Sequence, residues 1–267
     1  MQVYADVLRY RELFWDLFRR DLRVRYRGSA IGLAWTLVNP LVLMGVYTLL
    51  FSVLMRIPGV GSIDNFPLFV LTGLVAWVFF QASIQTATTT IVGNSALVKQ
   101  VRFPRQLLPL SVVATNLVTL AVMLAVVLSF ALWLLPETRT TFWAAIPLLI
   151  PLVGLASGLG LLVACANALF RDVEHLVGAA LLPLFLLTPI FYSFEQLPGL
   201  DDKERLVNVM YYGNFMVPMV EALRDPLFFG DLPDAGDVIY CVVAAAVALA
   251  LGALVFNRVD DRLVAEL

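Results

Sequence analysis

The sequence predicts an all-α membrane protein with six transmembrane helices, an amino-terminal amphipathic helix at the membrane interface and a re-entrant helix pair before the last span. Two observations support this fold class: an apolar composition and long runs without charged residues. The 267 residues are 61% hydrophobic and 14% charged, with a mean hydropathy of +0.88. Soluble domains are roughly half apolar and about a quarter charged, so lipid is the expected solvent for most of this chain.

Residues 1–27 are expected to form a helix that lies in the cytoplasmic membrane interface. Tyr10, Leu13, Phe14, Leu17 and Phe18 recur at helical spacing, which predicts an apolar face in lipid. The arginines expected to face lipid headgroups or a partner are Arg19, Arg20, Arg23, Arg25 and Arg27. Membrane anchoring alone would explain this pattern. However, the helix leads without a break into the first span, so a force on it would be transmitted into the membrane.

Six uncharged runs provide the roughly 20 apolar residues that a helix needs to cross the bilayer. They are 28–55, 65–98, 106–136, 140–170, 175–194 and 238–257. We therefore expect one transmembrane domain over 1–267. It consists of the interface helix at 1–27, five spans within 28–195, an extracytoplasmic loop with re-entrant helices at 196–236, the sixth span at 237–258 and a cytoplasmic tail at 259–267.

The positive residues predict the orientation of the chain. An even number of spans leaves both termini on one side, and thirteen of the 18 Lys and Arg residues lie on that side. The positive-inside rule therefore predicts that both termini are cytoplasmic. The first thirty residues are basic and amphipathic, which does not fit a cleavable signal peptide.

The segment VKQVRFPRQLLPLS, residues 98–111, connects the second and third predicted spans. Pro104 excludes the preceding Phe103 from the α region, so a short helix over 94–102 should end there, with Lys99 and Arg102 on one side. Arg105 follows directly. The positive-inside rule would explain the three cations but not the aromatic residue. Anchors of protein interfaces are typically aromatic and arginine side chains, so this loop is interpreted as a docking element.

The segment NALFRDVEHL, residues 167–176, ends the fourth predicted span and contains Arg171, Asp172 and the single histidine. His175 would suit proton transfer or a pH switch. It lies at the edge of the bilayer, however, and no carboxylate lies deep in a predicted span to exchange a proton with it. We therefore interpret the segment as a second cytoplasmic feature and not as a proton relay.

Few groups within the predicted spans can do chemistry. The sequence has no GxxxxGK[ST] phosphate loop and no carboxylate cluster of the kind that a membrane-bound metal-dependent transferase uses, so no metal site is predicted. Cys165 and Cys241 fall in apolar runs and are interpreted as small buried residues. The GxxxG motif at Gly154 and Gly158 is interpreted as helix packing within the bundle. If the chain does work, the energy must therefore enter from elsewhere.

Residues 206–220 are apolar enough to enter the bilayer but too short to cross it. The stretch is interrupted by Asn208, Gly213, Asn214 and Pro218. This pattern predicts two short helices that dip back into the membrane from the outer side, which is allowed where protein or water covers the broken backbone. An interfacial helix that caps the bundle is the alternative.

Four segments, in this order along the chain, resemble a known family: RYRGSAIGLAWTLVNPLVLMGVYTLLFSVL, VRFPRQLLPL, NALFRDVEHL and GNFMVPMVEALRDPLFFGDLP. They are similar to the transmembrane subunit of the ATP-binding-cassette exporters of cell-surface polysaccharides, the O-antigen, teichoic-acid and capsule group. The resemblance covers nearly the whole chain. One departure is Phe215, where relatives commonly have proline after the asparagine.

The resemblance implies a channel-forming permease that exports a lipid-linked polysaccharide across the bacterial cytoplasmic (inner) membrane. It implies a homodimer bound to two copies of a separate cytoplasmic ATPase subunit. ATP and Mg would then bind the partner, while this chain would bind no cofactor, bind no nucleic acid and be no enzyme by itself. The residues expected to couple it to the ATPase are Lys99, Arg102, Phe103, Pro104, Arg105, Arg171 and Asp172. The re-entrant helices, with Asn214, Pro218, Glu221 and Arg224, would frame the outer mouth.

A polysaccharide path needs aromatic faces and uncharged hydrogen-bonding groups, because aromatic rings pack on the apolar faces of sugars. The candidates for lining such a path are Trp35, Tyr47, Phe51, Trp77, Phe80, Gln81 and Tyr192. Trp and Tyr also cluster at membrane interfaces, so an interfacial role is the alternative for each.

Two other functions are compatible with these features. An ATP-binding-cassette exporter permease for a drug, an antibiotic or a lipid would keep the ATPase partner but carry a different substrate. A membrane-embedded transferase would act alone. The lack of intramembrane carboxylates and histidine pairs argues against the transferase.

Overall fold

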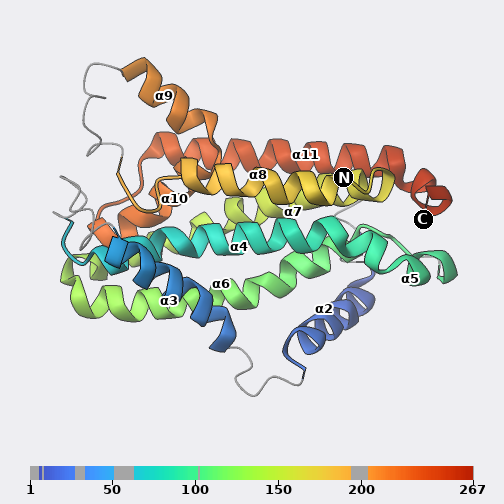
Figure 1. Cartoon of the computed structure of the whole chain (residues 1–267), viewed down its shortest axis with the longest axis horizontal. Coiled ribbons are helices and arrows are strands. Elements are labelled where there is room, and N and C mark those ends of the chain that lie inside the picture. Colours follow the sequence, from blue (N-terminus) through green and yellow to red (C-terminus); the bar gives the residue numbers. More distant parts are fainter. Residues whose placement is uncertain are drawn as a thin grey trace.

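The computed structural model describes residues 6–7, 9–27, 34–50, 63–101, 103–193 and 204–266. Within these residues the regular structure is helical and contains no β-strand, as the sequence predicts. The long helices run side by side along the long axis of the molecule (Figure 1). Helix α5 (Ser95–Gln100) and the carboxyl end of α11 (Ala235–Glu266) lie at one end, and α9 (Glu204–Gly213) and α10 (Met216–Arg224) lie towards the other. These are named the α5 end and the α10 end.

Four helices in the described part of the chain are long and apolar enough to cross a membrane. They are α4 (Phe66–Gly93), α6 (Leu107–Leu134), the continuous segment Phe142–Leu169, and Ala235–Asp260 of α11. The third of these joins the short turn η5 (Phe142–Ala144) to α7 (Ala145–Leu169). They correspond to the second, third, fourth and sixth predicted spans.

The first and fifth predicted spans correspond to shorter helices. Helix α3 (Trp35–Thr48) lies inside the first, whose flanking residues 28–33 and 51–62 lie outside the described residues. Helix α8 (Val173–Leu187) ends well before the predicted residue 194. The reason is local: Thr188 precedes Pro189 and adopts an extended backbone, with ψ 129°, because a residue before proline is excluded from the α region. The full set of six spans stays a prediction.

Helix α4 is the centre of the bundle. In its span window 78% of the residues are buried, compared with 28% in α6 and in α11. It packs against α6, α7, α8 and α10. Its buried side chains include Phe69, Trp77 and Phe79, so the other helices are arranged around one apolar rod.

Helices α7 and α11 form the most extensive contact in the bundle. Their backbones touch at two glycines: a Cβ atom on Gly158 would lie 2.3 Å from the carbonyl carbon of Ala248, and one on Gly252 would lie 2.5 Å from the carbonyl oxygen of Gly158. No residue with a side chain fits at either position. The interpretation of the GxxxG motif as helix packing is confirmed. Cys165 and Cys241 are buried free thiols, as predicted.

Helix α2 (Arg11–Tyr26) is the predicted amphipathic helix, and it packs against α6. Leu17 is buried in a cluster with Leu107 and Leu108, and Leu13 and Phe14 pack against the same cluster. The apolar face predicted to lie in lipid is therefore used in part to attach the helix to the bundle.

Candidate functional site

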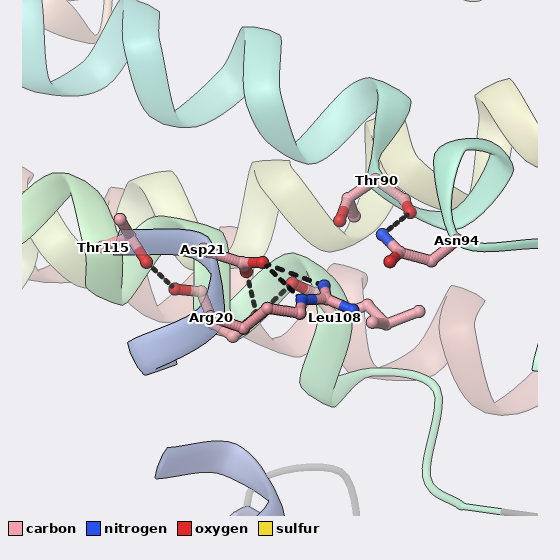
Figure 2. Close-up of polar contacts among 7 residues, drawn as sticks. Arg20, Asp21, Thr90, Asn94, Leu108 and Thr115 are labelled. Carbon is pink, nitrogen blue, oxygen red and sulfur yellow. Dashed lines mark hydrogen bonds and ion pairs between the residues drawn. The ribbon is translucent and has the colours of Figure 1, made fainter. Parts of the chain in front are cut away.

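The loop that follows α4 lies at the α5 end. Helix α4 stops at Gly93, and the Asn94 side-chain amide donates a hydrogen bond of 2.7 Å to the Thr90 carbonyl oxygen (Figure 2). The short helix predicted over 94–102 is α5, which is two residues shorter at its carboxyl end. Lys99 is exposed on it. Arg102 lies outside the described residues.

Phe103 and Pro104 are half-buried. Phe103 packs against the cluster formed by Leu17 of α2, Val98 of α5 and the start of α6. The loop and the interface helix therefore form one packed unit. The structure shows that Phe103 contributes to this internal packing. Its contact with an ATPase stays a prediction.

Arg105 fastens the loop to the end of α11. Its Nη1 atom lies 2.8 Å from Asp260 Oδ1 and 2.7 Å from the Asp260 carbonyl oxygen. The neighbouring Gln106 donates from Nε2 to Asp6 Oδ2 at 2.7 Å. Residues from near both ends of the described chain thus meet at this loop. Arg105, predicted as a docking cation, also has an internal role.

The five arginines predicted on α2 are all exposed: Arg19, Arg20, Arg23, Arg25 and Arg27. Arg20 forms an ion pair of 2.9 Å with Asp21. An open hollow of about 680 Å³ is lined by Asp16, Arg19, Arg20, Arg23, Val24 and Arg27. This concentration of positive charge suits an anionic headgroup or an acidic protein surface.

Polar contacts connect α2 to the interior of the bundle. Arg25 Nη1 donates to Asn116 Oδ1 of α6 at 2.6 Å, and Asn116 Nδ2 donates to Thr86 Oγ1 of α4 at 3.1 Å. Ser111 Oγ of α6 donates to Asp21 Oδ2 at 3.2 Å, in the region shown in Figure 2. Asn116 is fully buried and was not among the residues predicted from the sequence. An asparagine in the middle of an apolar span was the available signal, because polar groups in spans need partners.

Arg171 and Asp172 are exposed in the turn between α7 and α8, as a contact surface requires. Asn167 holds this turn in place: its Nδ2 donates to the Thr88 carbonyl oxygen at 2.9 Å, and its Oδ1 accepts from the Glu174 backbone N–H at 3.0 Å. Phe170, which was not among the predicted site residues, is 68% exposed directly beside the charged pair.

Two candidate path residues in α4 lie in the core of the chain. Trp77 and Phe80 are each 2% exposed and pack near Phe185 and Phe215 respectively. Trp77 Nε1 donates to Gln81 Oε1 at 2.8 Å. In a single chain Trp77 and Phe80 are therefore packing residues. Their role in lining a polysaccharide path stays a prediction.

The remaining candidates differ in exposure. Tyr47 of α3 stacks on Phe191, with ring centroids 3.6 Å apart. Tyr192 is half-buried, and Trp35 is largely exposed. Phe51 lies outside the described residues.

Arg224 is the most unusual side chain of the α10 end, because its exposed fraction is 0%. Nη1 lies 2.8 Å from Glu221 Oε1, and Nη2 donates to the Pro189 carbonyl oxygen at 2.8 Å. The guanidinium carbon lies 3.9 Å from the centre of the Phe69 ring. A charge in such a place needs both a counter-charge and hydrogen bonds, and Arg224 has both.

Asn214 lies between α9 and α10. Its Oδ1 accepts from the Met216 backbone N–H at 3.0 Å, which satisfies a free donor in the first turn of α10. Its Nδ2 donates to Thr188 Oγ1 at 3.1 Å. Pro218 is buried within α10, and Phe215 is half-buried with its ring against Phe80. The four residues predicted at the outer mouth therefore belong to one compact unit.

A hollow of about 330 Å³ opens at this end. It is lined by Ser193, Tyr211, Glu221, Asp225, Phe229, Asp231 and Asp237. Burial raises the pKa of the Asp225 carboxyl from 3.8 to about 7, and the negative charges of Glu221 and Asp237 add to the rise. Within the described residues no group of three or more His, Cys, Asp or Glu side chains is arranged to hold a metal ion.

In the part of the chain that the structure describes, four apolar helices are long enough to cross a bilayer, which defines an integral membrane protein. The chain belongs to the ABC-2 type transporter family, whose model matches residues 12–228. The O-antigen export system permease protein RfbA of Myxococcus xanthus is 32% identical to it over 261 residues, which is 96% of each chain. A Klebsiella pneumoniae protein of the same name is 28% identical over 91% of this chain and 90% of its own. The polysialic acid transport protein KpsM of Escherichia coli is 22% identical over 92% of each.

Proposed function

We propose that this chain is the channel-forming permease subunit of an ATP-driven exporter that moves a lipid-linked polysaccharide across the bacterial cytoplasmic membrane. The observation that carries the proposal is similarity, over nearly the whole length, to proteins named for O-antigen export and polysialic acid transport. A match of this extent includes both ends of the bundle and not only the apolar helices.

In this proposal the α5 end is cytoplasmic. Arg105 and Gln106 contact Asp260 and Asp6, so both ends of the described chain lie on the side that carries Lys99. Most of the positive residues are on that side, as the positive-inside rule requires of a cytoplasmic face. Helices α3 and α8 complete six spans, and α9 and α10 form the re-entrant pair at the outer side.

The working assembly contains two copies of this chain and two copies of an ATPase subunit that binds ATP and Mg. Exposed groups at the α5 end support such a partner: Lys99, Arg171 and Asp172 are exposed, and Phe170 supplies an aromatic anchor beside them. Aromatic and arginine side chains that are exposed in the free protein and become buried in the complex are the usual anchors of protein interfaces.

The experiment is to delete the gene in its native host and to measure surface glycan. Mild periodate oxidation of intact cells followed by hydrazide labelling reports surface glycan without knowledge of its identity, and lysed cells give the total. We expect the surface fraction to fall while lipid-linked polymer accumulates inside. An unchanged surface fraction together with new sensitivity to an antibiotic would instead favour a drug exporter. Purification in mild detergent should recover the ATPase subunit with this chain.

A further inference from the structure

Helix α8 connects the two ends of the molecule. It begins after the exposed turn at Arg171 and Asp172 and ends at Leu187. Only Leu181 and Phe185 are buried within it, in contrast to α4. The residues that follow, 188–191, are buried at the α10 end; they are named the exit segment. A helix with few buried side chains can change position at less cost than one packed on all sides.

Arg224 binds the backbone of the exit segment. Its Nη2 donates to the carbonyl oxygens of Pro189 at 2.8 Å and Ile190 at 3.3 Å. These two carbonyls follow the end of α8, where no further helical turn supplies donors. A charged donor gives a strong bond in a site that excludes water. Gly73 of α4 makes room for it, since a Cβ atom there would lie 2.7 Å from Nη2.

A second contact repeats this attachment. Asn214 donates to Thr188 Oγ1, so the turn before α10 and the last residue of α10, Arg224, both contact the exit segment. On the other side, the ring of Phe191 stacks on Tyr47 of α3. The exit segment is therefore held by polar contacts to the α9–α10 pair and by an aromatic contact to α3.

We propose that Arg224 and Asn214 are positioning residues that bind the α9–α10 pair to the exit segment, so that the pair moves with α8 as one unit. This inference rests on the proposed function. A partner that acts on the turn at Arg171 and Asp172 would then change the outer mouth through α8. The opposite arrangement, in which the pair separates from α8 to open the mouth, requires these contacts to break in every cycle.

A reversible cross-link distinguishes the two arrangements. Thr188→Cys and Asn214→Cys are introduced together in a Cys165→Ala, Cys241→Ala background, because the two side chains are in contact, with Asn214 Nδ2 3.1 Å from Thr188 Oγ1. The full chain is expressed with its ATPase partner, and surface glycan is measured by periodate and hydrazide labelling with the disulfide oxidised or reduced. We expect the oxidised form to export within about twofold of the reduced form, since coupled motion leaves this distance unchanged. A block of export by the disulfide, or failure to cross-link, would overturn the proposal.

Substitution of the arginine supplies the second test. Arg224→Gln should reduce the surface fraction of glycan about tenfold, the size expected for loss of a coupling between distant sites, while the purified complex keeps its partner and its ATPase rate. Asn214→Asp keeps the acceptor for Met216 and loses the donor to Thr188, so a smaller loss is expected. Arg205→Gln, on the exposed side of α9, should export normally.

Rescue separates positioning from folding. In the Arg224→Gln background the disulfide between positions 188 and 214 should restore export when oxidised and not when reduced, which a general loss of stability would not do. Normal export by Arg224→Gln, or loss of the ATPase partner from it, would contradict the inference. Neither result bears on whether the unmodified complex exports polysaccharide, which the gene deletion tests separately.

Discussion

The two ends of this molecule treat charge in opposite ways. At the α5 end the side chains of Arg105 and Asp260 are 17% and 38% exposed, and Lys99 and Arg171 are exposed at the same end. At the α10 end Arg224 is completely buried and bound to Glu221 and to backbone carbonyls. Exposed ion pairs contribute little to stability, whereas a buried charge depends on every partner. The α5 end therefore offers charge to another molecule, and the α10 end uses charge to hold its own helices together.

The largest effect expected from this contrast is on stability. Arg224→Met should lower the free energy of unfolding by about 3 kcal/mol, because the Glu221 carboxylate loses its buried counter-charge. Arg105→Met should cost less than about 1 kcal/mol, as for other partly exposed pairs. Thermal unfolding of both variants in the same detergent measures the difference. Equal losses would mean that burial does not distinguish the two ends.

An intermediate effect is expected at the contact between α2 and the bundle. Asn116→Leu should cost about 1–2 kcal/mol, because it leaves Arg25 without its acceptor and Thr86 without its donor in a partly buried site. Asn208→Leu, at an exposed position of α9, is the matched control and should change stability little. A variant at Asn116 as stable as the control would show that α2 is held by its apolar side chains alone.

A smaller, pH-dependent effect is expected at Asp225. Its pKa is raised to about 7 in the folded chain, so the folded state keeps a proton that the unfolded chain has already released near pH 4. Stability should therefore fall as the pH rises through the interval between those values. Asp225→Asn should remove this fall and be more stable than the wild type at pH 8, as measured by unfolding midpoints between pH 5 and 8. Parallel profiles for the two proteins would contradict the assignment.

The smallest effect on stability is expected for the exposed charges of the α5 end. Lys99→Glu with Arg171→Glu should change the free energy of unfolding by less than about 0.5 kcal/mol, yet reduce the amount of ATPase subunit that co-purifies. Arg139→Glu should leave the partner bound, because Arg139 is exposed in the turn Pro136–Thr140, which contacts the residues that follow α10. If the Lys99→Glu, Arg171→Glu variant recovers the full amount of ATPase subunit, the contact with that subunit lies elsewhere on the chain.

Local pattern predicted the helices well and the polar contacts poorly. The uncharged runs located α4, α6, α7 and α11 because length and composition alone define such segments. The early end of α8 was also readable, since Pro189 follows Thr188, but the apolar run continued past it. In contrast, Arg25 and Asn116 are 91 positions apart in the sequence, and Arg224 and Pro189 are 35 apart. The spacing of residues along a helix does not predict contacts between residues so far apart in the sequence, because only the fold brings them together.

Phe103 illustrates the same limit. Its position among cations favoured an exposed side chain, but its packing against the cluster that contains Leu17 of α2 leaves it half-buried. Phe170, with a similar neighbour in Arg171, is not covered and stays exposed. Sequence indicates which residues are suited to a contact, whereas burial by distant helices decides which of them are available for it.

The contact between Gly158 and Gly252 has a mechanical consequence. With backbone against backbone, α7 and α11 have no layer of side chains on which to slide, so they act as a single rigid strut. Bending is then left to the joint between α7 and α8, where the chain leaves helical geometry at the extended residue Phe170. This joint makes α8 a lever that is hinged beside the exposed turn at Arg171 and Asp172 and that carries the exit segment at its other end.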